Sequence, residues 1–75
     1  MLSEMCILDP TGHSRQTWDA AVPVEVEAAR SMFNSLRKKG YVAYHVKKDG
    51  EPGEVMTDFD PEAGKVIMSP PLAGG

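Results

Sequence analysis

The chain has 75 residues, with 11 Asp or Glu against 8 Lys or Arg, so its formal net charge at pH 7 is -3. This length suits one small domain, and the acidic balance argues against a nucleic-acid binder, which usually carries a basic stripe. One cysteine excludes a disulfide framework and a multi-cysteine zinc site. We see no apolar run typical of a membrane span or signal peptide, so we expect a cytoplasmic protein without membrane contacts.

The first segments predict a hairpin. Residues 5–8 form a short apolar run that is closed by the turn residues Asp9, Pro10 and Gly12. Such a run indicates a strand buried on both faces, and this would make Cys6 a small buried residue. The polar segment from residue 13 to residue 18 is the second strand, in which Trp18 is more typical of a core than of a partner contact.

An amphipathic helix is the clearest element of the sequence. Spacings of four and three residues place five apolar side chains on one stripe: Val22, Val26, Ala29, Phe33 and Leu36. Pro23 suits the first turn, the basic residues Arg37 to Lys39 suit the negative C-terminal end, and Gly40 supplies a left-handed stop. We therefore expect a helix over about Pro23–Lys39, with one face packed on a sheet.

Three further strands are expected after the helix. Residues 41–47 alternate, with Val42, Tyr44 and Val46 on one face and His45 on the other, which we place away from the helix. Residues 48–53 form a loop by composition, and residues 55–59 and 65–69 are the last two strands. The order β-β-α-β-β-β predicts a small α+β fold with one helix on one face of the sheet. We expect one globular domain over residues 1–69 and an extended tail over residues 70–75.

The sequence offers little for catalysis. It contains no phosphate-binding loop, dinucleotide fingerprint, zinc-protease motif or nucleophile elbow. We expect His13 and His45 to be solvent-exposed rather than catalytic, and a thiol buried in an apolar strand would disfavour the reactive thiolate. The sequence thus predicts a protein that is not an enzyme and has no catalytic residue and no cofactor.

A calcium loop is the one metal site that the sequence suggests. Asp58, Asp60 and Glu62 alternate like the first ligands of such a loop, but Ala63 stands where a glycine is required and Ser69 stands where the twelfth residue should be Glu. An acidic turn that keeps a sheet edge soluble is the better interpretation. We therefore predict no metal site.

The C-terminal stretch is the strongest candidate for a site. Pro70 and Pro71 cannot donate to a sheet ladder, so the last strand must end before them. Six residues from Pro70 span at most ~20 Å at ~3.3 Å each, which is enough to enter the cleft of another protein. Gly74 and Gly75 remove every side chain from the tip, so a narrow channel could admit it. A frayed chain end is the plain alternative.

The element order together with this ending resembles the ubiquitin-like β-grasp fold. The final six residues are similar to the tails of the small sulfur-carrier proteins, namely the molybdopterin synthase small subunit and the thiamine-pathway sulfur carrier: Pro70, Pro71, Leu72, Ala73, Gly74 and Gly75. The resemblance implies that an activating enzyme adenylates the Gly75 carboxylate with ATP. Sulfur transfer then gives a thiocarboxylate, or an acceptor protein's amine gives an isopeptide conjugate.

A second function class stays open from the sequence. The chain could be a non-enzymatic interaction or assembly module, such as an accessory or phage-type structural protein. Its tail or an unpaired sheet edge would then dock on an assembly neighbour in an extended conformation.

Overall fold

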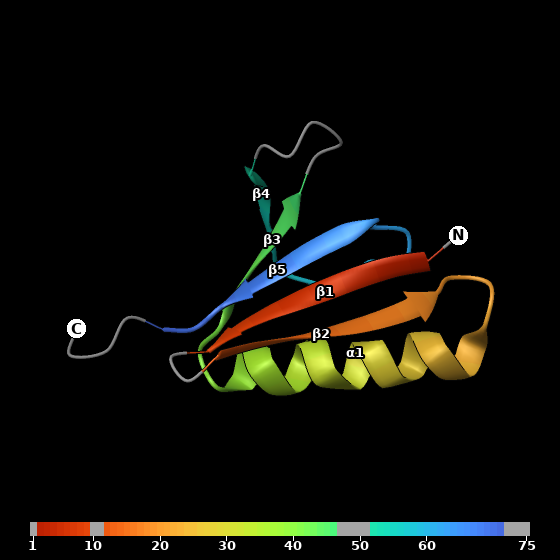
Figure 1. Cartoon of the computed structure of the whole chain (residues 1–75), viewed down its shortest axis with the longest axis horizontal. Helices are drawn as coiled ribbons and strands as arrows, with labels where there is room; N and C mark the ends of the chain where they lie inside the picture. The colour runs from red at the N-terminus through yellow and green to blue at the C-terminus, as the bar shows by residue number, and fades with distance from the viewer. Residues whose placement is uncertain (1, 10–11, 47–51, 72–75) are drawn as a thin grey trace.

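The computed structural model of the chain describes residues 2–9, 12–46 and 52–71 (Figure 1). These residues form five strands and one helix, in the order β-β-α-β-β-β. The elements are β1 (Leu2–Asp9), β2 (Gly12–Asp19), α1 (Pro23–Lys38), β3 (Val42–Val46), β4 (Pro52–Met56) and β5 (Lys65–Ser69). The predicted small α+β class with one helix is confirmed.

The strands form one mixed sheet in the order β2-β1-β5-β3-β4. The first and last strands, β1 and β5, pair in parallel near its centre, and the other neighbouring strands pair antiparallel. Figure 1 shows α1 running alongside β2 and β1 on one side of this sheet. The C-terminal strand is therefore held between two neighbours, β1 and β3, and leads the chain out from the middle of the sheet.

The helix forms where its sequence predicts. Pro23 occupies the first turn, and Glu25 accepts a hydrogen bond from the backbone N–H of Asp19 at 2.9 Å. Arg37 and Lys38 lie in the last turn, where positive charge offsets the helix dipole. Four of the five predicted stripe residues are buried: Val26, Ala29, Phe33 and Leu36. The fifth, Val22, is half-buried and precedes the helix as its N-cap, and the helix ends one residue earlier than predicted.

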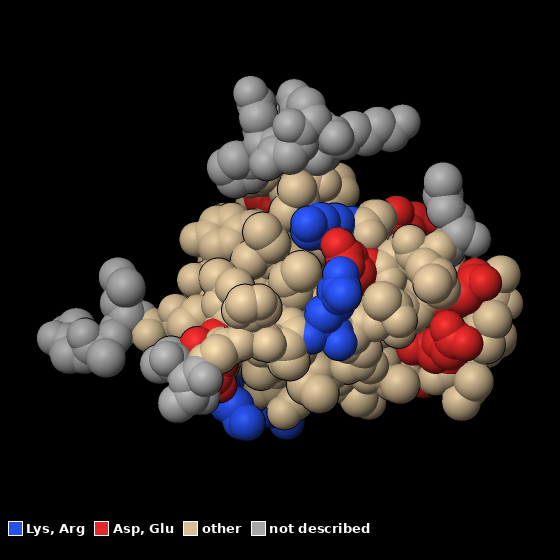
Figure 2. All heavy atoms as spheres, viewed as in Figure 1, with Lys and Arg blue, Asp and Glu red and all other residues tan. Residues whose placement is uncertain are grey.

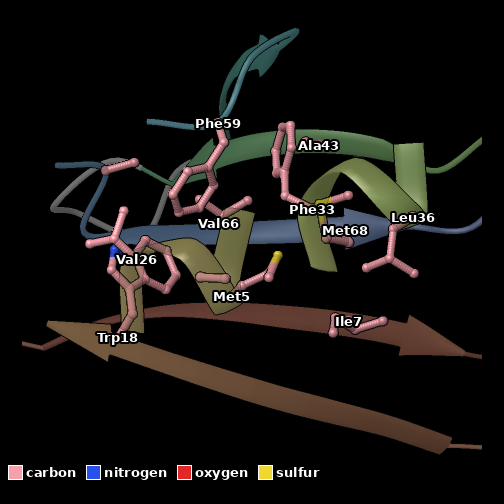
Figure 3. Packing of buried hydrophobic residues seen from close by; sticks show 12 residues of the cluster. Met5, Ile7, Trp18, Val26, Phe33, Leu36, Ala43, Phe59, Val66 and Met68 are labelled. Carbon is pink, nitrogen blue, oxygen red and sulfur yellow. The ribbon is translucent and has the colours of Figure 1, made fainter. Parts of the chain in front are cut away.

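Phe59 is the residue on which the two layers of the core meet (Figure 3). Its ring centroid lies 5.1 Å from that of Trp18 on β2 and 5.6 Å from that of Phe33 on α1. The Arg30 guanidinium lies over the same ring, 5.6 Å from its centroid, a cation–π distance. Trp18 is fully buried, as predicted, and its indole N–H donates to the Pro61 carbonyl at 3.0 Å. These contacts tie the segment between β4 and β5 to the helix.

The predicted burial of β1 on both faces is wrong. Ser3, Met5 and Ile7 are buried, whereas Cys6 between them is only half-buried and points to the opposite face. The reason is that α1 covers one face, and no segment among the described residues covers the other, which we call the open face. A run of apolar residues does not distinguish a doubly covered strand from one whose outer face carries a few apolar groups.

The face assignment of β3 is also corrected. Ala43 is fully buried, so its side of the strand faces the helix, and the half-buried Val42, Tyr44 and Val46 belong to the open face. His45 shares the face of Ala43 and pairs in register with the buried Val66. The larger apolar residues of β3 thus occupy the uncovered side, and the small Ala43 lies on the helix side.

The fourth strand lies earlier in the chain than predicted. It covers Pro52–Met56 instead of residues 55–59, so Pro52 and Gly53 belong to a strand and not to a loop. β4 is an edge strand, and edge strands are where proline is tolerated in a sheet. The register between β3 and β4 shifts between Tyr44 and Val46, an irregularity that the sequence does not reveal. Phe59, which was expected in this strand, lies after its end. It is buried through its contacts with other aromatic rings.

Truncation of Phe33 tests whether α1 is held to the sheet by this stripe. Phe33→Ala should lower the free energy of unfolding by about 3–5 kcal/mol, since it removes a fully buried ring and leaves a cavity. Met32→Ala, at the neighbouring residue that is 38% exposed, is the matched control and should change stability much less. Thermal unfolding followed by circular dichroism measures both. Equal melting temperatures for the two variants would show that α1 does not pack through this face.

Candidate functional site

The root of the tail is the best-defined part of the candidate site. β5 ends at Ser69, which pairs in register with Val42 at the start of β3. Pro70 and Pro71 follow immediately, and their missing N–H groups end the ladder there, in agreement with the expected stop. Pro70 is half-buried and Pro71 is exposed. The other predicted site residues, Leu72 to Gly75, lie outside the described residues.

The end of α1 lies beside this root. The N–H of Gly40 donates to the Arg37 carbonyl and the N–H of Tyr41 donates to the Leu36 carbonyl, both at 3.0 Å. This pair of bonds is the Schellman motif, which requires a left-handed residue at Gly40, and Gly40 has a φ of 97°. The chain therefore turns from helix to strand within three residues, so that residues 40–42 lie next to residues 69–71.

One contact joins the helix end to the tail root, and one hydrogen bond holds the turn at the helix end. A Cβ built on Gly40 would lie 3.5 Å and 3.6 Å from the Cβ and Cγ atoms of Pro71, so the proline ring approaches the glycine closely. The Arg37 guanidinium donates to the Tyr41 carbonyl at 3.1 Å in a partly buried position. The side chain of Arg37 thus fixes the same turn that Pro71 contacts.

The open face presents one row of side chains across all five strands. Successive register partners form this row: Arg15, Cys6, Ile67, Tyr44 and Val55. Four of the five are uncharged, and Val55 is 55% exposed at the sheet edge. Figure 2 shows a stripe of charged groups over β5, β1 and β2, with a broad uncharged area beside it toward the end of β5. This uncharged area adjoins the root of the tail.

Glu4 organises the charged stripe. Its carboxylate accepts from Arg15 on β2 at 3.2 Å and pairs with Lys65 on β5 at 3.4 Å, so it bridges three adjacent strands. The Glu4 side chain is 26% exposed, whereas those of Arg15 and Lys65 are 65% and 47% exposed. The two cations therefore remain available to solvent on a chain whose net charge is negative.

The residues considered for catalysis or metal binding do not come together. His13 is exposed on β2, as expected, and pairs in register with Leu8. His45 is half-buried and lines a hollow with Glu54, Asp58 and Asp60. Among the described residues, no group of three or more His, Cys, Asp or Glu side chains is arranged to hold a metal ion.

The acidic turn has a structural role in the chain. The Asp60 side chain accepts the backbone N–H of Glu62 at 2.9 Å, and its carbonyl accepts the N–H of Ala63 at 3.0 Å. These bonds close the turn that leads into β5, as is usual for Asp in turns. The bonds of Asp60 agree with the turn that the sequence favours over a calcium loop.

Sequence reasoning missed two features of this region. The apolar composition of β1 led to the prediction that both of its faces are buried, so the open face was missed. Glu4, between the buried Ser3 and Met5, is the signal for a solvated face. The contact of Gly40 with Pro71 joins residues far apart in the chain, and no local pattern predicts it. Gly40 was predicted only as the stop of the helix.

Comparisons with known proteins give no relative from which a function could be inferred. No protein-family model, curated protein or solved structure matches the chain. In the part of the chain that the structure describes, α1 falls short of the length and apolar character that a membrane-spanning helix needs.

Neutralising Glu4 tests how far the charged stripe contributes to stability. Glu4→Gln keeps the shape of the side chain but removes the charge shared by Arg15 and Lys65. Because both partners are well exposed, the free energy of unfolding should fall by less than about 1 kcal/mol, and the difference should shrink at high salt. Urea unfolding at low and high ionic strength measures this. A loss of several kcal/mol that salt does not reduce would contradict it.

Proposed function

We propose that the chain is a ubiquitin-like carrier or modifier whose Gly75 carboxylate is activated by a partner enzyme. The observation that carries the proposal is the position of β5. Because this strand is bonded on both sides, by β1 and β3, the tail that follows Ser69 has a rigid base at the middle of the sheet. A tail that delivers its end into another protein needs such a base.

The architecture is consistent with the proposed β-grasp identity. A mixed sheet with one helix on one face, in the order β-β-α-β-β-β, is what the resemblance of the sequence implies. The two prolines that separate β5 from Leu72 support the same interpretation, since they release the chain from the ladder and keep it extended.

The chemistry requires an activating enzyme because a free carboxylate is a poor electrophile. A Gly75 carboxylate oxygen attacks the α-phosphorus of ATP, pyrophosphate leaves, and an acyl-adenylate forms. Hydrosulfide then attacks the acyl carbon and displaces AMP to give a thiocarboxylate, or an acceptor amine displaces AMP to give an amide. In this proposal the chain is a substrate and carrier, and the partner supplies the catalytic groups.

The partner is thus a protein, and we place the function in the cytoplasm, where ATP is available. The uncharged part of the open face adjoins the tail root and offers this partner a surface free of charged groups to desolvate. The competing proposal, an interaction or assembly module, rests on the same face and on the exposed Val55 at the β4 edge. The two differ in what happens to Gly75.

Intact mass under denaturing conditions, on N-terminally tagged protein from the native host, tests the proposed function. We expect a species heavier by the exchange of one oxygen for sulfur, or a set of larger covalent adducts. Deletion of Gly75, or addition of one alanine after it, should abolish the modified species while the melting temperature stays unchanged, because Met68 is the last residue of the described core. The mass also reports whether Gly75 carries a free carboxylate.

Leu72→Asp distinguishes the competing proposal. A docking module should tolerate the added alanine but lose a stoichiometric partner when Leu72 becomes charged. A single unmodified mass together with such a partner would replace the carrier function by the docking function.

A further inference from the structure

We infer that the C-terminal end of α1 orients the tail, with Gly40 and Arg37 as positioning residues for the delivery of Gly75. The inference deepens the proposed function and rests on it for its purpose. The contacts at the helix end can be tested separately from any chemistry at Gly75.

Pro71 is placed by packing against the helix end. Its ring atoms lie 3.5 and 3.6 Å from the position that a Cβ of Gly40 would take, which is ordinary van der Waals contact. Gly40 has a φ of 97°, a conformation that side chains disfavour, and the Schellman bonds hold it there. Gly40 is therefore required by its backbone conformation, while a side chain that extends beyond a Cβ toward Pro71 would push against the proline ring.

In the turn between α1 and β3, Tyr41 has no backbone hydrogen bond to offer Pro70 and Pro71. The packing of Pro71 is therefore the main constraint on the tail root. Both backbone groups of Tyr41 are used by the helix: its N–H donates to Leu36, and its carbonyl accepts from Arg37. Across from it, Pro70 and Pro71 have no N–H to offer. Beyond the Val42–Ser69 pair, the ladder therefore gives way to side-chain packing.

The chain between β5 and Pro71 is itself stiff. A proline ring fixes φ, and a residue that precedes proline is restricted to extended conformations. Ser69 and Pro70 both precede a proline. The orientation of the chain at Pro71 is thus set by β5 on one side and by Gly40 on the other. The four residues from 72 to 75 span at most ~13 Å, so a partner that binds Gly75 must approach the end of α1 closely.

A contact measurement on the unmodified full chain tests the placement directly. Nuclear Overhauser spectra should show cross-peaks between the α-protons of Gly40 and the ring protons of Pro71. Gly40→Asn then adds an amide group beyond a Cβ that would already touch the Pro71 ring, and asparagine is the side chain that best tolerates a left-handed backbone. We expect the amide chemical shifts of residues 72–75 to change, although they lie more than thirty residues away in the chain.

Gly12→Asn is the matched control. Gly12 also has a positive φ, 149°, but a Cβ there meets nothing within 4 Å. This variant should leave the shifts of residues 72–75 unchanged. If Gly40→Asn does not fold, Arg37→Met serves instead, because it removes the hydrogen bond to the Tyr41 carbonyl, together with one positive charge of the last turn, and leaves Gly40 unchanged. Missing cross-peaks, or tail shifts that neither Gly40→Asn nor Arg37→Met changes, would overturn the inference.

The modified fraction in the native host links the placement to function. Gly40→Asn should lower it by roughly tenfold or more, since a misplacement of about 1 Å can cost on the order of 100-fold in rate. Combined with Pro71→Ala, which removes the ring that Asn would displace, the loss should be smaller than the sum of the single effects. If Gly40→Asn acted only by straining the backbone at residue 40, it would lower the melting temperature, and its effect on modification would not depend on Pro71→Ala.

The outcomes separate the two proposals. Normal modification of Gly40→Asn would overturn the positioning role and leave the carrier function standing. An unmodified wild-type chain would overturn the carrier function and, with it, the purpose given to the helix end, while the cross-peaks and shifts still decide whether α1 orients the tail.

Discussion

The parallel pairing of β1 with β5 is the constraint on which the rest of this structure depends. Parallel strands cannot be joined by a hairpin, so the chain must leave the sheet and return between them. Here the intervening segments supply the helix, the β3–β4 pair and the loop that carries Phe59. The same pairing puts the last strand in the interior of the sheet. The tail therefore begins from one of the most firmly held parts of the fold.

The helix has two roles in this account. Its stripe from Val26 to Leu36 closes one face of the sheet, and Phe59 links it to β2 through Trp18. Its C-terminal turn, closed by a glycine, places residues 40–42 beside the end of β5. A longer connection between α1 and β3 would still allow the core but would separate the helix end from Pro71. The short turn thus joins the stability of the domain to the geometry of the tail root.

The sequence predicted the elements better than the faces. The periodicity that marks the helix and the prolines that end β5 are local signals, and both were confirmed. Which side of β1 and β3 is covered depends on where α1 packs, so Cys6 and His45 were assigned to the wrong environments. β4 was misplaced because Phe59 is buried through aromatic contacts outside any strand. The contact of Gly40 with Pro71 depends on the tertiary fold, and only the structure reveals it.

If the carboxylate of Gly75 becomes an activated acyl group, as we propose, hydroxylamine should trap it. The purified chain would be incubated with native-host extract, ATP and hydroxylamine, and its C-terminal peptide analysed by mass spectrometry. We expect a hydroxamate at Gly75, formed as hydroxylamine displaces AMP, only when ATP is present and only on a chain that ends at Gly75. No hydroxamate, or the same amount without ATP, would contradict the claim.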